Sequence, residues 1–455
     1  MIIDLLKKLG YSTVSESYYD KVKMWQSWYK GKVTGFHDYT LYNGSKVLHL
    51  EKYSMGMAKT VCEDWANYIF NKDTKISTGT DSVDEALLEA FKSVRFNTNI
   101  NECIESAFAT GTIAVVVLEN DKGVDLNYIK DTTMIFPLSW DNGEIINCCF
   151  ASQKVIDGKK VLYLNIHKQH GEQWLISNRF FELDKNGKPK NEIIIDGVEE
   201  QFVSDVKRYF IYEPAIMNNV DYDTPLGMSI YANAIDQLKG VDNVYDSYVN
   251  EFVLGKKRVM VAADAVRVTE DGNGKQHPIF DPNDALFYML PNTNQMGDTL
   301  IKEIDMNLRI QEHKEGLQDM LNALSIKIGM GTKHYSFVGG AVTATEVKST
   351  SDTLYNSMVK HETPLEEFLC GLCDSMLYLL GYPNEKVSVE FDDSVIRDQN
   401  TDLMNNLQLL QNRVLGRADV AAYWKGMDRD KAAEFIKQID SEEIPTADGF
   451  ANEVV

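Results

Sequence analysis

Two long amphipathic segments, residues 224–254 and 306–329, constrain the fold more strongly than any other feature of the sequence. In the first, Thr224 followed by Pro225 is typical of a helix start, and apolar residues then recur at alternating spacings of three and four. At 1.5 Å per residue, a helix over this segment would be roughly 40 Å long. Its apolar seam comprises Leu238, Val241, Tyr245, Tyr248 and Phe252, and its acidic face includes Asp236, Asp242 and Asp246.

The second segment presents Leu317, Leu321 and Leu324 on one helical face, with charged residues elsewhere. Between the two segments, residues 255–305 contain short apolar runs, RVMVAADAVRV and ALFYMLPN, on either side of the turn DGNG. This pattern predicts a small β-rich module held between two helices. On spacing alone, the helices are equally compatible with the core of a helical bundle.

A Gly-rich, basic and aromatic loop joins the second segment to the next helix. Its sequence, GTKHYSFVGGAVTATEV, covers residues 331–347. Gly339 and Gly340 allow a sharp backbone reversal. Thr343 and Glu346 have the spacing of a capping box, so we expect a new helix to begin there.

The chain before residue 224 divides into a helical part and a strand-rich part. Helical patterns dominate before residue 112. Residues 112–213 alternate short β-branched and aromatic runs with Asn-Gly and Asp-Gly pairs, which are typical of tight hairpins. We therefore predict a helical opening followed by an antiparallel β meander.

Helical patterns also dominate the chain after the loop. One long pattern covers residues 344–381, and Pro364 within it predicts either a kink or a fresh helix start. KVSVEFDD, residues 386–393, predicts one late strand that returns to the earlier β region. Short helices and a polar tail follow over residues 400–455.

The composition limits the partners of the chain. Lys and Arg total 46 against 68 Asp and Glu, giving a formal net charge of −22. This charge argues against a protein that coats DNA or an anionic membrane by charge neutralisation, but not against DNA passing nearby. Six cysteines are too few for a disulfide framework, and no window resembles a membrane span, so we expect a soluble protein made in a reducing cytoplasm.

No motif indicates catalysis. A P-loop is absent from the sequence, so we expect neither ATP hydrolysis nor a cofactor. Cys370 and Cys373 have the spacing of a metal pair, but without a second pair they are expected to be buried small residues. The enzyme alternative is an acidic hydrolase that uses paired carboxylates, such as Asp221 with Asp223 or Asp392 with Asp393.

Two stretches carry a family resemblance, YFIYEPAIMNNVDYDTPLGMSIYANAIDQLKGVDNVYDSYVNEF and VGGAVTATEVKSTSDTLYNSMVKHE. In these stretches and in the order of its parts, the chain resembles the portal proteins of long-tailed (siphophage-type) bacteriophages and related prophages. The runs P-L-G-x-S and T-A-T-E-V are the most specific parts of the resemblance. It implies an α+β portal-type fold. By position, the implied parts are a wing, 1–223 with a return strand at 382–399; stem helices, 224–254 and 306–329; a clip, 255–305; a tunnel loop, 330–343; a long kinked helix, 344–381; and a small helical crown with a tail, 400–455.

The resemblance also implies a function and partners. Identical subunits, usually about twelve, would form a ring at the capsid vertex of the virion, with a channel for double-stranded DNA during packaging and ejection. The ring would dock the terminase large subunit and then the head-tail adaptor, beside capsid and scaffold proteins, with no membrane contact. Synthesis in the cytoplasm of a host bacterium follows from this. The alternative within the particle is another head component, such as a minor head protein or scaffold.

Candidate residues follow for each part of such a ring. The DNA-facing tunnel loop would include Lys333, His334, Tyr335, Ser336, Phe337, Val338, Gly339 and Gly340. Candidates for the channel lining are Asp236, Asp242 and Asp246, and the clip contact would use Lys256, Lys257, Arg258, Phe287 and Tyr288. The seam Leu238, Val241, Tyr245, Tyr248 and Phe252 would pack the stem, against the second stem helix of the same chain, a neighbouring subunit, or both.

Overall fold

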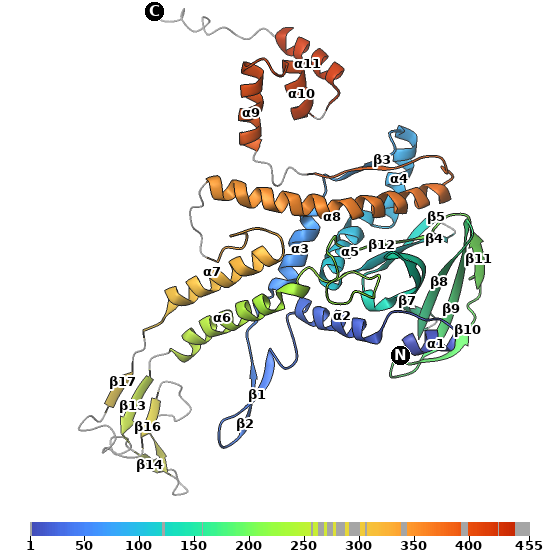
Figure 1. Cartoon of the computed structure of the whole chain (residues 1–455). Coiled ribbons are helices and arrows are strands. Elements are labelled where there is room, and N and C mark those ends of the chain that lie inside the picture. Colours follow the sequence, from blue (N-terminus) through green and yellow to red (C-terminus); the bar gives the residue numbers. More distant parts are fainter. Residues whose placement is uncertain are drawn as a thin grey trace, which may run out of the picture. The chain divides into compact units, whose positions relative to one another are not determined.

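The computed structural model describes most of the chain, and Figure 1 shows its helices and strands. The chain divides into two compact units, residues 1–392 and 393–455. Helices and strands both contribute, which confirms the α+β class predicted from the sequence. The described residues are 2–120, 123–156, 158–255, 258–262, 268–270, 276–278, 287–290, 301–304, 307–337, 344–392, 399–425 and 427–441.

Helices α1 to α5 occupy the N-terminal part of the first unit. Their buried faces form an aromatic core, in which Trp65 stacks on Phe108 with 5.6 Å between ring centroids. Two antiparallel strands, β1 and β2, which the helical pattern did not predict, separate α2 from α3. The bounds are α1 Ile2–Lys8, α2 Glu16–Tyr29, β1 Asp38–Tyr42, β2 Val47–Glu51, α3 Met57–Ile69, β3 Lys75–Ser77, α4 Asp81–Ser93 and α5 Phe96–Thr110.

The region predicted as one meander forms antiparallel hairpins, but it divides between two sheets. One sheet has the order β10-β9-β8-β7-β6 with β11 paired to β9, and the other has the order β12-β4-β5. Asn142 and Gly143, with φ of 49° and 85°, make the tight turn between β6 and β7. The strands are β4 Ile113–Asn120, β5 Gly123–Ile129, β6 Ile135–Asp141, β7 Glu144–Ile156, β8 Lys159–His170, β9 Gln173–Leu183, β10 Pro189–Ile193, β11 Gln201–Ser204 and β12 Tyr209–Tyr212.

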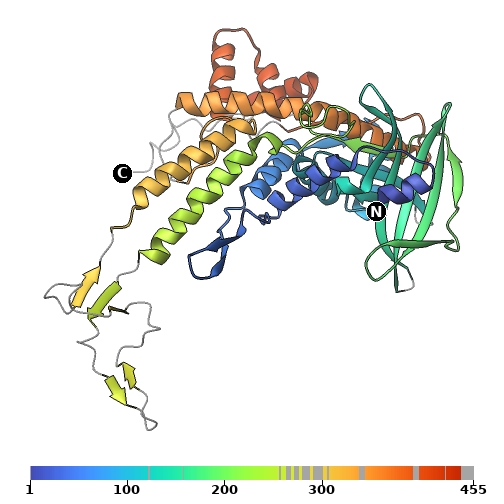
Figure 2. The same cartoon turned by 60° about the horizontal axis from the view of Figure 1, so that its bottom comes forward.

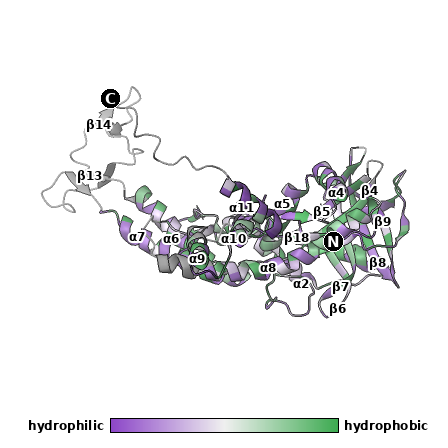
Figure 3. Ribbon diagram, turned by 90° about the horizontal axis from the view of Figure 1, so that it is seen from above, coloured by the Kyte–Doolittle hydropathy of each residue, from purple (hydrophilic) through white to green (hydrophobic). Residues whose placement is uncertain are grey.

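Burial of β4 explains the division. Residues 113–117 are at most 1% exposed, so this strand is covered on both faces and has a strand partner on each side. Strand β12 supplies the second partner by returning to β4, with Tyr209 opposite Val116. Hydrophobic residues concentrate in the strands around β4, β8 and β9 (Figure 3).

Helix α6 spans Ile235–Leu254 after the short 3-10 helix η2, Ala232–Ala234, so the predicted helix start at Thr224 is wrong. The preceding segment is fixed to the N-terminal part by its backbone instead. Gly227 N donates to Thr112 Oγ1 (2.9 Å), and Tyr18 Oη donates to Gly227 O (2.7 Å). The backbone N–H and C=O of Gly227 therefore bond to distant residues and not to the neighbouring turns of a helix.

The segment between α6 and α7 contains short strands. Strand β13 pairs in parallel with β16 and antiparallel with β17, and β14 pairs with β15. The bounds are β13 Arg258–Ala262, β14 Val268–Glu270, β15 Gln276–Pro278, β16 Phe287–Leu290, β17 Ile301–Ile304 and α7 Ile310–Lys327.

Helix α8, Ala344–Leu379, continues through Pro364, so the structure has one helix where the sequence left a kink or a fresh start open. Close packing of α8 on β12 is possible because Gly371 has no side chain; a Cβ there would meet the Phe210 ring at 2.7 Å. Strand β18, Ser388–Glu390, follows and pairs with β3. The predicted return of this strand to the β region 112–213 is therefore wrong.

Contacts in the turn after α8 explain the direction of β18. Asp374 of α8 accepts hydrogen bonds from Val387 N (3.1 Å) and Lys386 Nζ (2.9 Å), which directs the chain back along the helix. The second unit contains α9 Gln399–Gln411, α10 Arg417–Lys425 and α11 Arg429–Ser441. Within it, Arg417 and Asp440 form a bidentate ion pair at 2.8 and 3.1 Å. Within the described ranges, no helix is long and apolar enough to cross a lipid bilayer.

Candidate functional site

Helices α6 and α7, called the helix pair below, pack along the first half of the predicted seam. Leu238 and Val241 are buried, as are Leu317 and Leu321 of α7. The axes approach closely at Gly240, where a Cβ atom would lie 2.9 Å from Met320 Sδ. This half of the seam therefore serves the packing of the chain against itself.

The second half of the seam is less covered. Tyr245 and Tyr248 are half-buried, and Phe252 is 42% exposed. Tyr248 contacts the rings of Phe252 and His313 edge to face, at 5.2 and 6.2 Å between centroids. The outer end of the helix pair thus leaves apolar surface exposed in the single chain.

A charged cluster joins the two helices at this outer end. Glu251 of α6 accepts hydrogen bonds from Arg309 N (3.0 Å), Nε (3.2 Å) and Nη2 (2.9 Å), and its Oε2 lies 3.3 Å from His313 Nε2. The Arg309 contacts lower the pKa of Glu251 to about 2. The carboxylate therefore stays charged and holds the start of α7 against the end of α6 throughout the physiological pH range.

The three aspartates predicted to line a channel occupy different environments. Asp236 is exposed and lies 3.2 Å from Lys239 Nζ. Asp246 is half-buried and accepts hydrogen bonds from Tyr53 N (3.0 Å) and Asn250 Nδ2 (3.1 Å). Both remain candidates for a lining.

Asp242 does not present its carboxylate to solvent, which corrects its assignment to the channel lining. The residue is 4% exposed and accepts hydrogen bonds from Met55 N (2.8 Å) and Ser54 Oγ (3.1 Å). It also lies 2.8 Å from His37 Nε2. A helical-wheel argument places Asp242 on the acidic face. At Asp242 that face is covered by His37, Ser54 and Met55.

The loop that follows α7 is held in place over residues 328–337, called the loop root below. Tyr335 Oη donates to Asp64 Oδ2 of α3 (2.9 Å), and burial raises the pKa of both groups. Gln318 of α7 donates from Nε2 to Tyr335 O (2.8 Å) and accepts at Oε1 from Phe337 N (2.9 Å). Helices α3 and α7 thus both form hydrogen bonds to residues 335–337.

The rings of the loop root also have partners. His334 lies against Tyr68 of α3, and Phe337 lies against Tyr248 of α6, each edge to face. The expectation that His334, Tyr335 and Phe337 face DNA is therefore corrected, because the first two pack on α3 and Phe337 packs on α6. Lys333, with φ of 60°, and Ser336 are exposed, while Val338, Gly339 and Gly340 lie outside the described residues.

The predicted clip residues are placed only by their backbone. Arg258 lies in β13, and Phe287 and Tyr288 lie in β16, the strand next to it. Val259 is opposite Phe287 in the parallel register. Lys256 and Lys257 lie outside the described residues.

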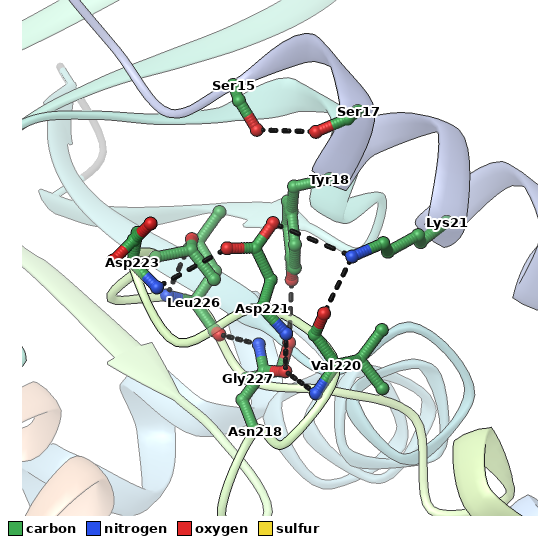
Figure 4. Close-up of polar contacts among 11 residues, drawn as sticks. Ser15, Ser17, Tyr18, Lys21, Asn218, Val220, Asp221, Asp223, Leu226 and Gly227 are labelled. Atoms are coloured by element: carbon green, nitrogen blue, oxygen red, sulfur yellow. Dashed lines mark hydrogen bonds and ion pairs between the residues drawn. The ribbon is translucent and has the colours of Figure 1, made fainter.

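The acidic pair Asp221 and Asp223 belongs to a folded loop rather than to an acid–base site. Figure 4 shows this loop against α2: Asp221 Oδ2 lies 3.7 Å from Lys21 Nζ, which donates to Val220 O at 2.7 Å. Asp221 Oδ1 accepts from Asp223 N (3.3 Å). These contacts give the pair a structural role, so the hydrolase alternative has no support from this pair.

Other chemistry-bearing residues are also packed inside. Cys373 is buried as expected, but Cys370 is only partly buried and donates to Val387 O at 3.4 Å. Burial raises the pKa of both thiols. Among the residues that the structure describes, no group of three His, Cys, Asp or Glu side chains is arranged to hold a metal. No local sequence pattern marks His37, which lies 2.8 Å from Asp242, or Glu213, whose pKa burial raises to about 8.

These features define an α+β protein with a helix pair that carries a strand-containing segment and is followed by an anchored loop. A family model described as phage portal protein, SPP1 Gp6-like, matches residues 11–443. The chain therefore belongs to this family of phage portal proteins and acts at the capsid vertex in DNA packaging. Members of the family are structural virion components that form homo-oligomeric rings. No curated protein matches the chain.

Proposed function

We propose that about twelve copies of this chain form a ring whose central channel conducts double-stranded DNA during packaging and ejection. In this proposal residues 1–223, with the return strand at 382–399, form the wing, and the helix pair is the stem. The strands between the two helices are the clip, and the helices of the second unit form a small crown. Synthesis occurs in the cytoplasm of the host bacterium. The observation that carries the proposal is the helix pair, closed at its outer end by Glu251 and Arg309.

The chemistry of the helix pair supports a conduit rather than a DNA-holding surface. Asp236 is exposed on α6, and Asp246 is half-buried on the same helix. DNA affinity rises steeply with the number of phosphates neutralised by Lys and Arg, so a lining that includes carboxylates lets the duplex slide. Lys333 is the exposed cation of the loop root and is our candidate for transient phosphate contact.

The outer end of the helix pair is the proposed docking end. There the clip, with Arg258, Phe287 and Tyr288, would meet the terminase large subunit during packaging and the head-tail adaptor afterwards. The wing and crown would face capsid and scaffold proteins. The Glu251 cluster would keep the two helices together while these partners exchange.

Electron microscopy of the purified chain, with light scattering for mass, tests the proposal. We expect annular particles with a central channel and a mass near twelve subunits. A chain that stays monomeric at every concentration and salt would contradict the ring. Solid particles or filaments would instead support another head component.

A further inference from the structure

The strands β1 and β2 form a ribbon, residues 38–51, that has no other strand partner among those described. Figures 1 and 2 show the ribbon projecting from the N-terminal part beside α6, in the same general direction as that helix. A two-stranded hairpin alone is marginally stable in water. A persistent ribbon therefore needs support at its root or cover on its faces.

The root of the ribbon is firmly fixed to α6. Lys52 Nζ donates to Asn243 Oδ1 (2.8 Å), and Tyr53 N donates to Asp246 Oδ1 (3.0 Å). Lys52 also lies over the Phe36 ring at 4.1 Å. The far turn is fixed too, since Asn43 Oδ1 accepts from Ser45 N and Lys46 N. The ribbon is thus an arm fixed to α6 at its root, with a turn that its own hydrogen bonds shape.

The exposed apolar residues of the ribbon lie near its turn. Leu41 is opposite Leu48, and Tyr42 is opposite Val47, so each face carries an apolar pair. Leu41, Tyr42 and Val47 are 51%, 66% and 56% exposed. Ordered and exposed apolar surface of this kind is typical of an interaction site.

The same chain offers a second apolar patch at the outer end of the helix pair. Phe252 and Val253 of α6 and Leu308 just before α7 are 42%, 45% and 39% exposed. Leu308 borders the end of α6, because a Cβ atom on Gly255 would lie 2.4 Å from Leu308 Cδ2. We call these three residues the outer patch.

We propose that the ribbon is an arm that packs on the outer patch of a second copy of this chain, the adjacent subunit of the ring. A closed ring needs two different complementary patches on each copy. The turn end of the ribbon and the outer patch both carry apolar residues that are exposed in the single chain. The inference rests on the proposed ring.

The dimensions agree with this contact. Five-residue strands extend about 17 Å from the root, and packed helices lie about 8–10 Å apart. Phe252 lies six residues beyond Asp246, about 9 Å further along α6. An arm rooted at Asp246 can therefore reach past its own helix to the level of the patch on a neighbour.

Leu41→Asp tests the arm, with Val155→Asp as the matched control. Val155 is 70% exposed and lies in β7 of the six-stranded sheet. We expect Leu41→Asp to raise the subunit concentration needed for ring formation at least about tenfold, and Val155→Asp to leave it within about twofold. Circular dichroism and thermal melting of both variants establish that they fold.

Cross-linking tests whether the ribbon contacts the outer patch of a second copy. Tyr42→Cys combined with Phe252→Cys, in a Cys370→Ser background, should give covalent ladders of subunits on oxidation, while either single variant should not. If the wild type forms rings and the folded Leu41→Asp variant assembles equally well, the inference is overturned, while the proposed ring still stands. Normal rings that fail only in head assembly would also overturn it, because the arm would then meet another head protein. Absence of wild-type rings would contradict the proposed function instead.

Discussion

The imidazole Nε2 of His37 lies 2.8 Å from Oδ2 of Asp242, a residue 205 positions later in the chain, and both side chains are almost completely buried. Nδ1 of the same ring accepts a hydrogen bond from Val33 N (2.9 Å). Because Nδ1 accepts, the proton of the neutral ring is on Nε2, which donates to the carboxylate. This contact joins the segment before the ribbon to the middle of α6.

Asp242→Ala should destabilise the chain, because it leaves one buried donor, from His37, and two part-buried donors, from Ser54 and Met55, without their acceptor. We expect the free energy of unfolding to fall by about 3 kcal/mol. Denaturant titration measures this change.

Asp236→Ala on the same helix is the control for that prediction. Its carboxylate is exposed, so its free energy of unfolding should change by no more than about 0.5 kcal/mol. Equal losses for the two variants would mean that Asp242 is not the anchor described here.

Gly227→Ala should also be strongly destabilising. A Cβ atom at Gly227 would lie 2.3 Å from Gly111 O, and a backbone carbonyl cannot rotate away as a side chain can. The free energy of unfolding should fall by about 3 kcal/mol or more. Gly316→Ala in α7, where the nearest atom is 3.8 Å away, should instead gain about 0.5–1 kcal/mol. A tolerated Gly227→Ala would contradict the close contact of the two backbones.

The sequence predicts turns and buried helix faces, because these features depend on residues close together in the chain. Asn142 and Gly143 mark a hairpin that is present, and the spacing of Leu238 and Val241 identifies the buried face of α6. Periodicity cannot show where that helix begins, because the long-range contacts of Gly227 decide it.

The same limit applies to the candidate site. Asp242 and Asp236 both lie on the acidic side of the expected helix, and only the tertiary structure covers one of them. Tyr335 belongs to a loop by composition, yet Asp64, 271 residues earlier, anchors it. Contacts between residues so far apart leave no local pattern in a single sequence.

Glu213 should make stability depend on pH. Burial raises its pKa to about 8 from the usual 4.5. Between these values the folded chain holds a proton that the unfolded chain releases, so stability falls as pH rises, by up to about 1.4 kcal/mol per pH unit. Glu213→Gln stays neutral and can still accept from Thr112 Oγ1. Denaturant titrations from pH 5 to pH 8 should therefore show a flatter profile for this variant.

The exposed Glu199→Gln provides the control for the Glu213 profile, since it removes one negative charge from the surface. Identical pH profiles for wild type and Glu213→Gln would show that Glu213 is already ionised at pH 7 in the folded chain.

Tyr335→Phe should loosen the loop root without disturbing the helix pair. The variant removes the hydroxyl that donates to Asp64, while the ring keeps its contact with His334. Because local opening governs proteolysis of folded chains, trypsin should cleave after the exposed Lys333 about threefold to tenfold faster. Tyr222→Phe, at a residue that is 72% exposed, should leave the cleavage rate unchanged. Unchanged cleavage in Tyr335→Phe would mean that the Gln318 hydrogen bonds alone hold the loop root.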